Sequence, residues 1–177
     1  MARLIAALLV LAALASCTSQ KIPDKSNLTL GSLSSWQLRG KIGVRSGQGN
    51  FNLGFAWNQS PASYDITLSA TLGTLVAQLN GNEKSVLLTL PDGSKYQGKR
   101  IDELLETRLG YHLPFSLLQY WVRGVPDPGI EYEPATNGFS QSGWLVEFRQ
   151  FGSRGPRKIE IQRTDLKLKL VALEWEY

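Results

Sequence analysis

The sequence predicts a mainly β fold, in which one long antiparallel sheet curves around two short α-helices. Three observations favour this class. Apolar and polar residues alternate along most of the chain from residue 36 onward, with the two-residue period of half-buried strands. Only two short segments between residues 101 and 122 carry the spacing of amphipathic helices. A sheet of roughly nine to eleven strands has to curl, split or close, so strong curvature is expected.

The first two strands are predicted at residues 36–44 and 51–57. In both segments the apolar side chains fall on one face and the polar side chains on the other. Gln48-Gly49-Asn50 between them is typical of a turn, so the two segments should form a hairpin. Its apolar face would carry Trp36, Leu38, Ile42, Val44, Phe51, Leu53, Phe55 and Trp57.

Turn residues divide the rest of the chain into further elements. Strands are expected at 64–68, 75–79, 86–90 and 95–97, and again at 144–151, 157–163 and 166–177. The helical spacing from Ile101 to Leu109 ends at Gly110, and Pro114 begins a second helix. Gly124 and the prolines after it end that helix.

The apolar face is richer in aromatic residues than a thin sheet on two short helices requires. A hydrophobic cavity beneath a helical lid would account for this bulk, and so would a filled core without a cavity. Periodicity alone does not distinguish a cavity from a filled core. The candidate cavity residues are Trp36, Phe51, Phe55, Trp57, Tyr64, Leu118, Trp121 and Trp144.

The first sixteen residues have the composition of a signal peptide. Arg3 supplies a positive charge, and residues 4–14 form an apolar run that is too short to cross a bilayer as a helix. Leu14-Ala15-Ser16-Cys17 then resembles the lipobox of bacterial lipoproteins, in which the cysteine becomes the lipidated N-terminus. The expected organisation is a signal peptide at 1–16, a lipidated N-terminus with a flexible tether at 17–34, and one domain at 35–177.

The composition argues against catalysis and against metal binding. Cys17 is the only cysteine and His112 the only histidine, which excludes a cysteine-based zinc cluster and a two-histidine metal site. We expect His112 to be structural, and Asp102, Glu103 and Glu106 to form a solvated helix face. The sequence therefore predicts no enzyme, no metal and no cofactor.

The formal net charge of +4 raises the question of a nucleic-acid partner. The basic residues of the strands alternate with the apolar ones, so they should lie on the outer face of the sheet. Lipid head groups or an acidic protein surface fit a lipoprotein better than nucleic acid does. These outer-face residues are Arg39, Lys41, Arg45, Lys167 and Lys169.

Several short motifs, taken in their order and spacing, resemble the LolB family of outer-membrane lipoprotein receptors. The longest runs from Tyr120 to Pro128 (Tyr-Trp-Val-Arg-Gly-Val-Pro-Asp-Pro). The others are Leu38-Arg39-Gly40, Phe55-Ala56-Trp57, Leu72-Gly73, Leu113-Pro114 and Leu173-Glu174-Trp175. The resemblance covers residues 36–177, with the lipobox ahead of it.

This resemblance implies an incomplete, half-open β-barrel with short helices as a lid over a hydrophobic cavity. It also implies a monomer anchored by lipidated Cys17 in the outer membrane of a Gram-negative bacterium, facing the periplasm. Such a receptor accepts acylated lipoproteins from the periplasmic carrier LolA and inserts them into the inner leaflet of the outer membrane. The alternative class is a structural or assembly-accessory lipoprotein with a filled core.

The resemblance further assigns a membrane-insertion loop. Leu72 occupies the apolar position of that loop, although Thr71 stands where the family commonly has proline. Without proline the backbone before Leu72 has one constraint fewer. Without the resemblance, Leu72 would be expected to fold back onto the core.

Overall fold

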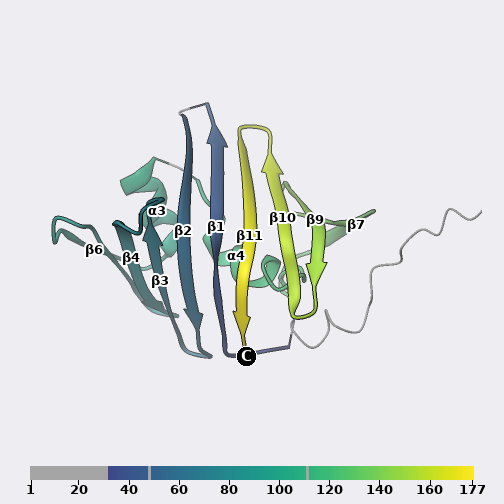
Figure 1. Cartoon of the computed structure of the whole chain (residues 1–177), viewed down its shortest axis with the longest axis horizontal. Helices are drawn as coiled ribbons and strands as arrows, with labels where there is room; N and C mark the ends of the chain where they lie inside the picture. The colour runs from purple at the N-terminus through teal and green to yellow at the C-terminus, as the bar shows by residue number, and fades with distance from the viewer. Residues whose placement is uncertain (1–31, 48, 111) are drawn as a thin grey trace, which may run out of the picture.

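The computed structural model describes residues 32–47, 49–110 and 112–177. The chain forms one eleven-stranded antiparallel sheet with the strand order β6-β5-β4-β3-β2-β1-β11-β10-β9-β8-β7, and β6 and β7 are its two free edges. Both helices lie on the same side of the sheet (Figure 1). We call that side the inner face. The expected fold class, a mainly β half-open barrel with short helices, is confirmed.

The strands on the N-terminal side of the sheet are β1 (Trp36–Ser46), β2 (Gly49–Gln59), β3 (Ser63–Ser69), β4 (Leu75–Asn82), β5 (Val86–Thr89) and β6 (Lys95–Gly98). The helices are α3 (Ile101–Leu109) and α4 (Phe115–Trp121). The remaining strands are β7 (Tyr132–Ala135), β8 (Gly138–Gln141), β9 (Trp144–Gly152), β10 (Gly155–Arg163) and β11 (Leu166–Glu176).

Strands that are neighbours in the sequence are also neighbours in the sheet, except for β6 and β7, which lie at opposite edges. The first strand, β1, pairs with the last, β11, so the two ends of the domain meet at the centre of the sheet. The connection from edge strand β6 to edge strand β7 contains both helices. This connection has to cross from one edge to the other, which brings the helices over the inner face (Figure 1).

Two of the strands were not predicted from the sequence. The hairpin of β7 and β8 lies in a segment for which the sequence predicts neither strand nor helix. β7 has only four residues, all exposed, and it contains Pro134. Proline cannot donate to a ladder and is tolerated at the edge of a sheet, so this strand carries no alternation by which to detect it.

The two faces of the sheet differ in chemistry, as the alternation predicted. Inner-face residues of β1, β2, β9, β10 and β11 are apolar and belong to one hydrophobic core together with the helices. The outer face carries the predicted basic residues, several of them in ion pairs. Glu160 alone receives Arg149, Lys167 and Lys169 at 3.0–3.2 Å.

Candidate hydrophobic binding site

The candidate site lies between α4 and the inner face of the sheet. Helix α4 buries Phe115, Leu117, Leu118 and Trp121, and the rings of Phe115 and Trp121 lie against aromatic rings of the sheet. No side chain of α4 is charged, so the helix is held by apolar packing.

One cluster of aromatic rings joins the start of α4 to the centre of the sheet. The ring of Phe115 lies 5.3 Å from that of Trp57, and Trp57 lies 5.1 Å from Trp36. Trp36 in turn lies 5.6 Å from Trp175 of β11. These tilted contacts are favourable aromatic geometries, and they connect β2, β1 and β11 beneath the helix.

A second cluster lies at the end of α4, under strands β8 and β9. Trp121 is fully buried, with its ring 6.4 Å from both Phe139 and Trp144. The guanidinium carbon of Arg163 sits 4.7 Å from the centre of the Trp144 ring. The inner face beneath α4 is therefore aromatic on both sides of β1 and β11.

The rings of Phe55 and Tyr64 each lie against a glycine of a neighbouring strand. A side chain at Gly40 would meet the Phe55 ring at 2.8 Å, and a side chain at Gly81 would collide with Tyr64. These glycines let each ring lie flat over an adjacent strand. Burial raises the pKa of Tyr64 to about 12, with a smaller contribution from the charge of Asp102.

All eight candidate cavity residues belong to or pack against this one core. Phe51 and Tyr64 are partly buried, whereas Trp36, Phe55, Trp57, Leu118, Trp121 and Trp144 are buried. The pocket between α4 and the sheet measures about 30 Å³, and Trp57, Tyr64, Ile66, Ile101 and Phe115 are among its lining residues. Ligand pockets ordinarily measure about 300–1,000 Å³. In this conformation the site is therefore filled by its own side chains.

A polar depression adjoins this small apolar pocket. It measures about 400 Å³ and shares Gln59, Tyr64, Ile101, Ser116 and Gln119 with the smaller pocket. It lies where the start of α3, the start of α4 and the β2–β3 turn meet. The depression therefore leads from solvent to the edge of the aromatic core.

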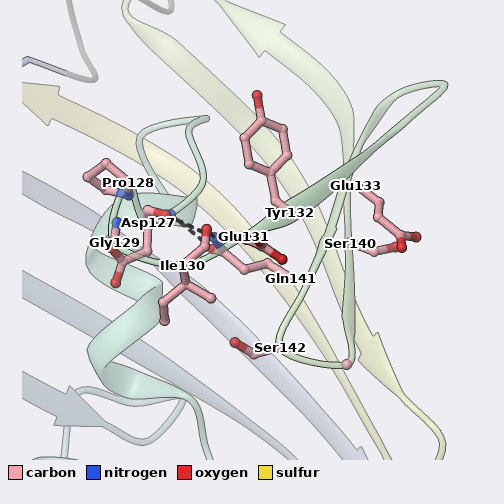
Figure 2. A pocket seen from close by; sticks show the side chains of 11 residues that line it. Asp127, Pro128, Gly129, Ile130, Glu131, Tyr132, Glu133, Ser140, Gln141 and Ser142 are labelled. Atoms are coloured by element: carbon pink, nitrogen blue, oxygen red, sulfur yellow. Dashed lines mark hydrogen bonds between the residues drawn. The ribbon is translucent and has the colours of Figure 1, made fainter.

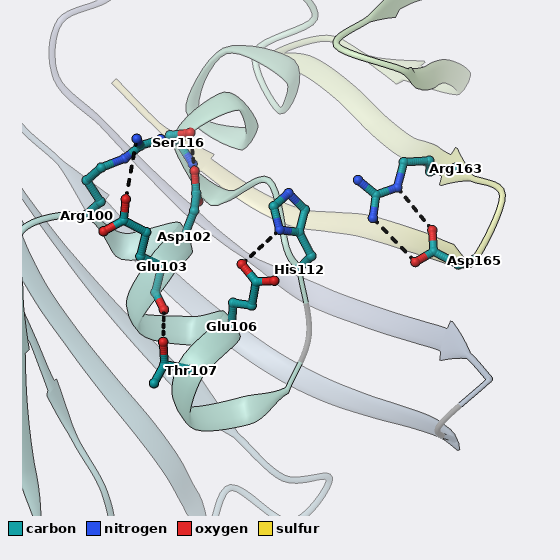
Figure 3. Close-up of polar contacts among 9 residues, drawn as sticks. All are labelled: Arg100, Asp102, Glu103, Glu106, Thr107, His112, Ser116, Arg163 and Asp165. Atoms are coloured by element: carbon teal, nitrogen blue, oxygen red, sulfur yellow. Dashed lines mark hydrogen bonds and ion pairs between the residues drawn. The ribbon is translucent and has the colours of Figure 1, made fainter.

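The two helices are linked at the same place. Asp102 of α3 accepts hydrogen bonds from the backbone N–H of Ser116, at 3.0 Å, and from its hydroxyl (Figure 3). Asp102 thus satisfies a backbone donor in the first turn of α4, and it is half-exposed, with this partner in addition to its place on the predicted solvated face. Glu103 and Glu106 are exposed as expected, and Glu106 lies 3.1 Å from Nδ1 of the exposed His112.

Leu72 does not fold back onto the core, and its side chain is 95% exposed. The backbone N–H of Ala70 donates to Thr74 O, and that of Gly73 donates to Ala70 O. Gly73 has φ of +82°, which favours glycine. The turn is thus held by its own hydrogen bonds and presents Leu72 to its surroundings.

The buried amide of Gln141 was not identified from the sequence. It lies beside a surface pocket of about 800 Å³ formed by residues 127–133 and 140–143 (Figure 2). An alternating strand would place Gln141 on the inner face with Phe139, but the strand itself was missed. Gln141 is flanked by Ser140 and Ser142, so nothing in the local sequence marks it as a buried side chain.

Some predictions fall outside this geometry. Cys17, the signal peptide and most of the tether lie outside the described residues. Within the described residues, no helix has the length and hydropathy needed to cross a membrane. No group of His, Cys, Asp and Glu side chains in that part of the chain could hold a metal ion.

The fold and the aromatic inner face define a class: a single open sheet with helices across its concave side. A crystal structure of a LolA superfamily protein from Nitrosomonas europaea shares this fold with a TM-score of 0.52 at 9% identity, over 88% of this chain and 94% of that one. The model of the family described as outer membrane lipoprotein LolB matches residues 34–175. The chain therefore belongs to the LolB family.

Individual relatives carry the same description. The outer-membrane lipoprotein LolB of Chromohalobacter salexigens is 33% identical over 99% of this chain and 91% of its own length. The protein of that name from Pseudomonas fluorescens is 35% identical over 82% of this chain and 76% of its own. The similarity therefore extends over nearly the whole chain.

Proposed function

We propose that this protein is an outer-membrane receptor that accepts lipoproteins from the periplasmic carrier LolA and inserts them into the inner leaflet of the outer membrane. The observation that carries this proposal is the aromatic inner face beneath α4, which offers apolar contact and no catalytic group. Membership of the LolB family supports it. In this proposal the protein is a monomer, anchored through lipidated Cys17, that faces the periplasm and performs no chemical step.

Binding of acyl chains requires α4 to move. The pocket beneath it, at about 30 Å³, is far smaller than the ordinary range of about 300–1,000 Å³ for ligand pockets. The start of α4 is linked to α3 through Asp102 and Ser116, beside the polar depression. We propose that the acyl chains enter there and displace α4 from Trp57 and Tyr64.

Transfer from the carrier needs no energy source if the receptor holds the acyl chains more tightly. A difference of about 1.4 kcal/mol gives a tenfold preference for the receptor. The test is to mix carrier loaded with an acylated lipoprotein with this protein and to follow the cargo by pull-down. Cargo that stays on the carrier would favour the alternative, a structural lipoprotein with a filled core.

A further inference from the structure

The outer face of the sheet contains a groove next to the turn that carries Leu72. It measures about 770 Å³ and lies over β1 and β2, beside β11 and the turn at 69–73. We call it the basic groove, because its charged lining residues are Lys41, Arg45 and Lys169. None of its described lining residues is acidic.

The strand register brings these three cations together. Lys169 lies opposite Gly43, between Lys41 and Arg45 on the outer face of β1. Lys41 and Arg45 are exposed, and neither forms an ion pair with another described residue. Lys169 pairs with Glu160 at 3.0 Å, but Glu160 is shared with two further cations, so the groove keeps an excess of positive charge.

Two glycines that line the groove leave room for polar side chains of the neighbouring strands. A Cβ added at Gly43 would lie 2.8 Å from Oδ1 of Asn52, and one at Gly54 would lie 2.8 Å from Oγ of Ser69. The amide of Asn52 and the hydroxyl of Ser69 thus lie over the glycines. Neutral donors beside cations are the groups that bind phosphate oxygens.

The position of the basic groove indicates which phosphate-bearing molecule it would meet. Ala70, Thr71 and Gly73 form one wall of it, and Leu72 between them is 95% exposed. When Leu72 enters the acyl region of a bilayer, the adjoining groove is brought to the level of the lipid phosphates. Basic side chains near an anionic membrane surface each add attraction that falls off within a Debye length.

We propose that the basic groove binds the head-group phosphate of an anionic phospholipid while Leu72 is inserted, and so orients the receptor during delivery. This inference rests on the proposed function, since it requires Leu72 to contact the membrane. Leu72 supplies the apolar contact, and the groove supplies the preference for an anionic surface.

The experiment compares two doubly substituted proteins that lose the same charge. Lys41→Gln/Arg45→Gln removes two cations of the groove, whereas Lys95→Gln/Lys158→Gln removes two exposed lysines that do not line it. Each is made in the full mature chain carrying Cys17→Ala, so that the anchor does not dominate. Binding is measured by flotation with phosphatidylcholine vesicles that contain or lack phosphatidylglycerol.

We expect the groove variant to bind phosphatidylglycerol vesicles about 10- to 30-fold more weakly, and the control variant to change less than about threefold. Binding to pure phosphatidylcholine vesicles should be unchanged. Asn52→Asp, which places a carboxylate in the lining of the groove, should weaken binding in the same lipid-dependent way.

The inference would be overturned by equal losses in both double variants, by unchanged vesicle binding in the groove variant, or by loss of uptake from the carrier with normal vesicle binding. The last result would assign the groove to the carrier. If the unsubstituted protein takes up no cargo, the proposed function fails. If it takes up and delivers cargo equally well to both vesicle types, only the inference about the groove fails.

Discussion

The indole nitrogen of Trp121 donates a 2.9 Å hydrogen bond to Oε1 of Gln141, and this contact ties the end of α4 to β8. The same oxygen accepts the backbone N–H of Asp127, while the amide nitrogen donates to the carbonyls of Asp127 and Ile130. Every hydrogen-bonding position of this buried amide is therefore occupied. If α4 opens, its Ser116 end is expected to move together with α3, because Asp102 ties that end to α3 whereas Gln141 ties the Trp121 end to the sheet.

Gln141→Leu should destabilise the fold by about 2–4 kcal/mol. The substitution leaves the buried indole N–H of Trp121 and the carbonyl of Ile130 without partners, and each such loss costs about 1–3 kcal/mol. Urea denaturation followed by tryptophan fluorescence measures the difference. Gln150→Leu, at an exposed position of β9, is the control and should change stability by less than about 0.5 kcal/mol. Equal stability of the two variants would contradict the role of Gln141.

Glu160 should make the fold sensitive to acid. Hydrogen bonds from Lys169, Lys167 and Arg149 lower the pKa of Glu160 to about 2, against an ordinary value of 4.5. The folded state therefore keeps this carboxylate charged at a pH where the unfolded chain binds a proton. The resulting stabilisation is complete above about pH 4.5 and is lost as the pH falls toward 2.

Denaturation between pH 2 and 5 tests this linkage. Because the ion pairs are partly exposed to water, the free energy of unfolding of the wild type should fall by about 1–2 kcal/mol over this range. Glu160→Gln should abolish that part of the pH dependence, whereas Glu133→Gln, at an exposed position of edge strand β7, should retain it. A wild-type profile unaffected by Glu160→Gln would show that the pKa of this group does not differ between the folded and unfolded states.

Strand alternation and helix-stop residues were sufficient to predict most of this fold. The hairpin of β1 and β2 and both helices lie close to their expected positions, because their apolar residues follow one period without interruption. The hairpin of β7 and β8 was missed since four-residue strands with Pro134 hold too little pattern. Periodicity also identified the face of each candidate residue, which is why all eight fall in one core.

The state of the site could not be predicted in the same way. Whether aromatic side chains line a cavity or fill it depends on how closely α4 approaches Trp57, a distance between elements that no local pattern encodes. The cap that Asp102 provides for α4 spans fourteen positions of the sequence. It therefore lies beyond any capping motif that short spacings reveal.

Phe55→Asp should weaken cargo uptake from the carrier. Phe55 is buried on the inner face, where an unpaired carboxylate beside acyl chains is costly. Uptake is measured by transfer of labelled lipoprotein, with circular dichroism to verify folding. Phe55→Leu keeps an apolar surface and should retain most of the uptake. A folded Phe55→Asp protein with unchanged affinity would remove Phe55 from the site.

Leu72→Glu should separate the receipt of cargo from its delivery. The side chain of Leu72 is 95% exposed. Its replacement should therefore change the free energy of unfolding by less than about 0.5 kcal/mol. Full burial of a leucine contributes about 1.5–3 kcal/mol, enough for a transient membrane contact. Transfer from carrier to receptor should therefore be normal, and transfer from receptor to vesicles should be lost.

Leu72→Met is the matched control, because it keeps an apolar side chain of similar volume, and it should deliver cargo normally. Normal delivery by a folded Leu72→Glu protein would refute the membrane contact. Loss of the first transfer alone would move Leu72 from the membrane-facing turn to the cargo or carrier surface.

The length of the tether should determine whether Leu72 can reach the membrane that holds the anchor. Nη1 of Arg123 donates to the carbonyl of Leu33 at 2.9 Å, which fixes the chain at the start of β1. The register places the Leu72 turn toward the other end of that strand, about 25 Å away at about 3.3 Å per residue. From Cys17 to Leu33 the extended chain reaches at most about 55 Å, which is sufficient.

Deletion of residues 20–31 shortens that reach to about 14 Å, so a domain that stands with β1 upright on the membrane could no longer place Leu72 in it. The lipidated deletion protein, reconstituted in vesicles, should still accept cargo from the carrier but should not deliver it to its own membrane. A Gly/Ser segment of the original length at 20–31 should restore delivery, because only reach is required. Added vesicles without receptor should still receive cargo from the deletion protein, since the Leu72 turn then faces away from the anchoring membrane. Delivery to its own membrane at the wild-type rate would show that delivery does not depend on the length of the tether.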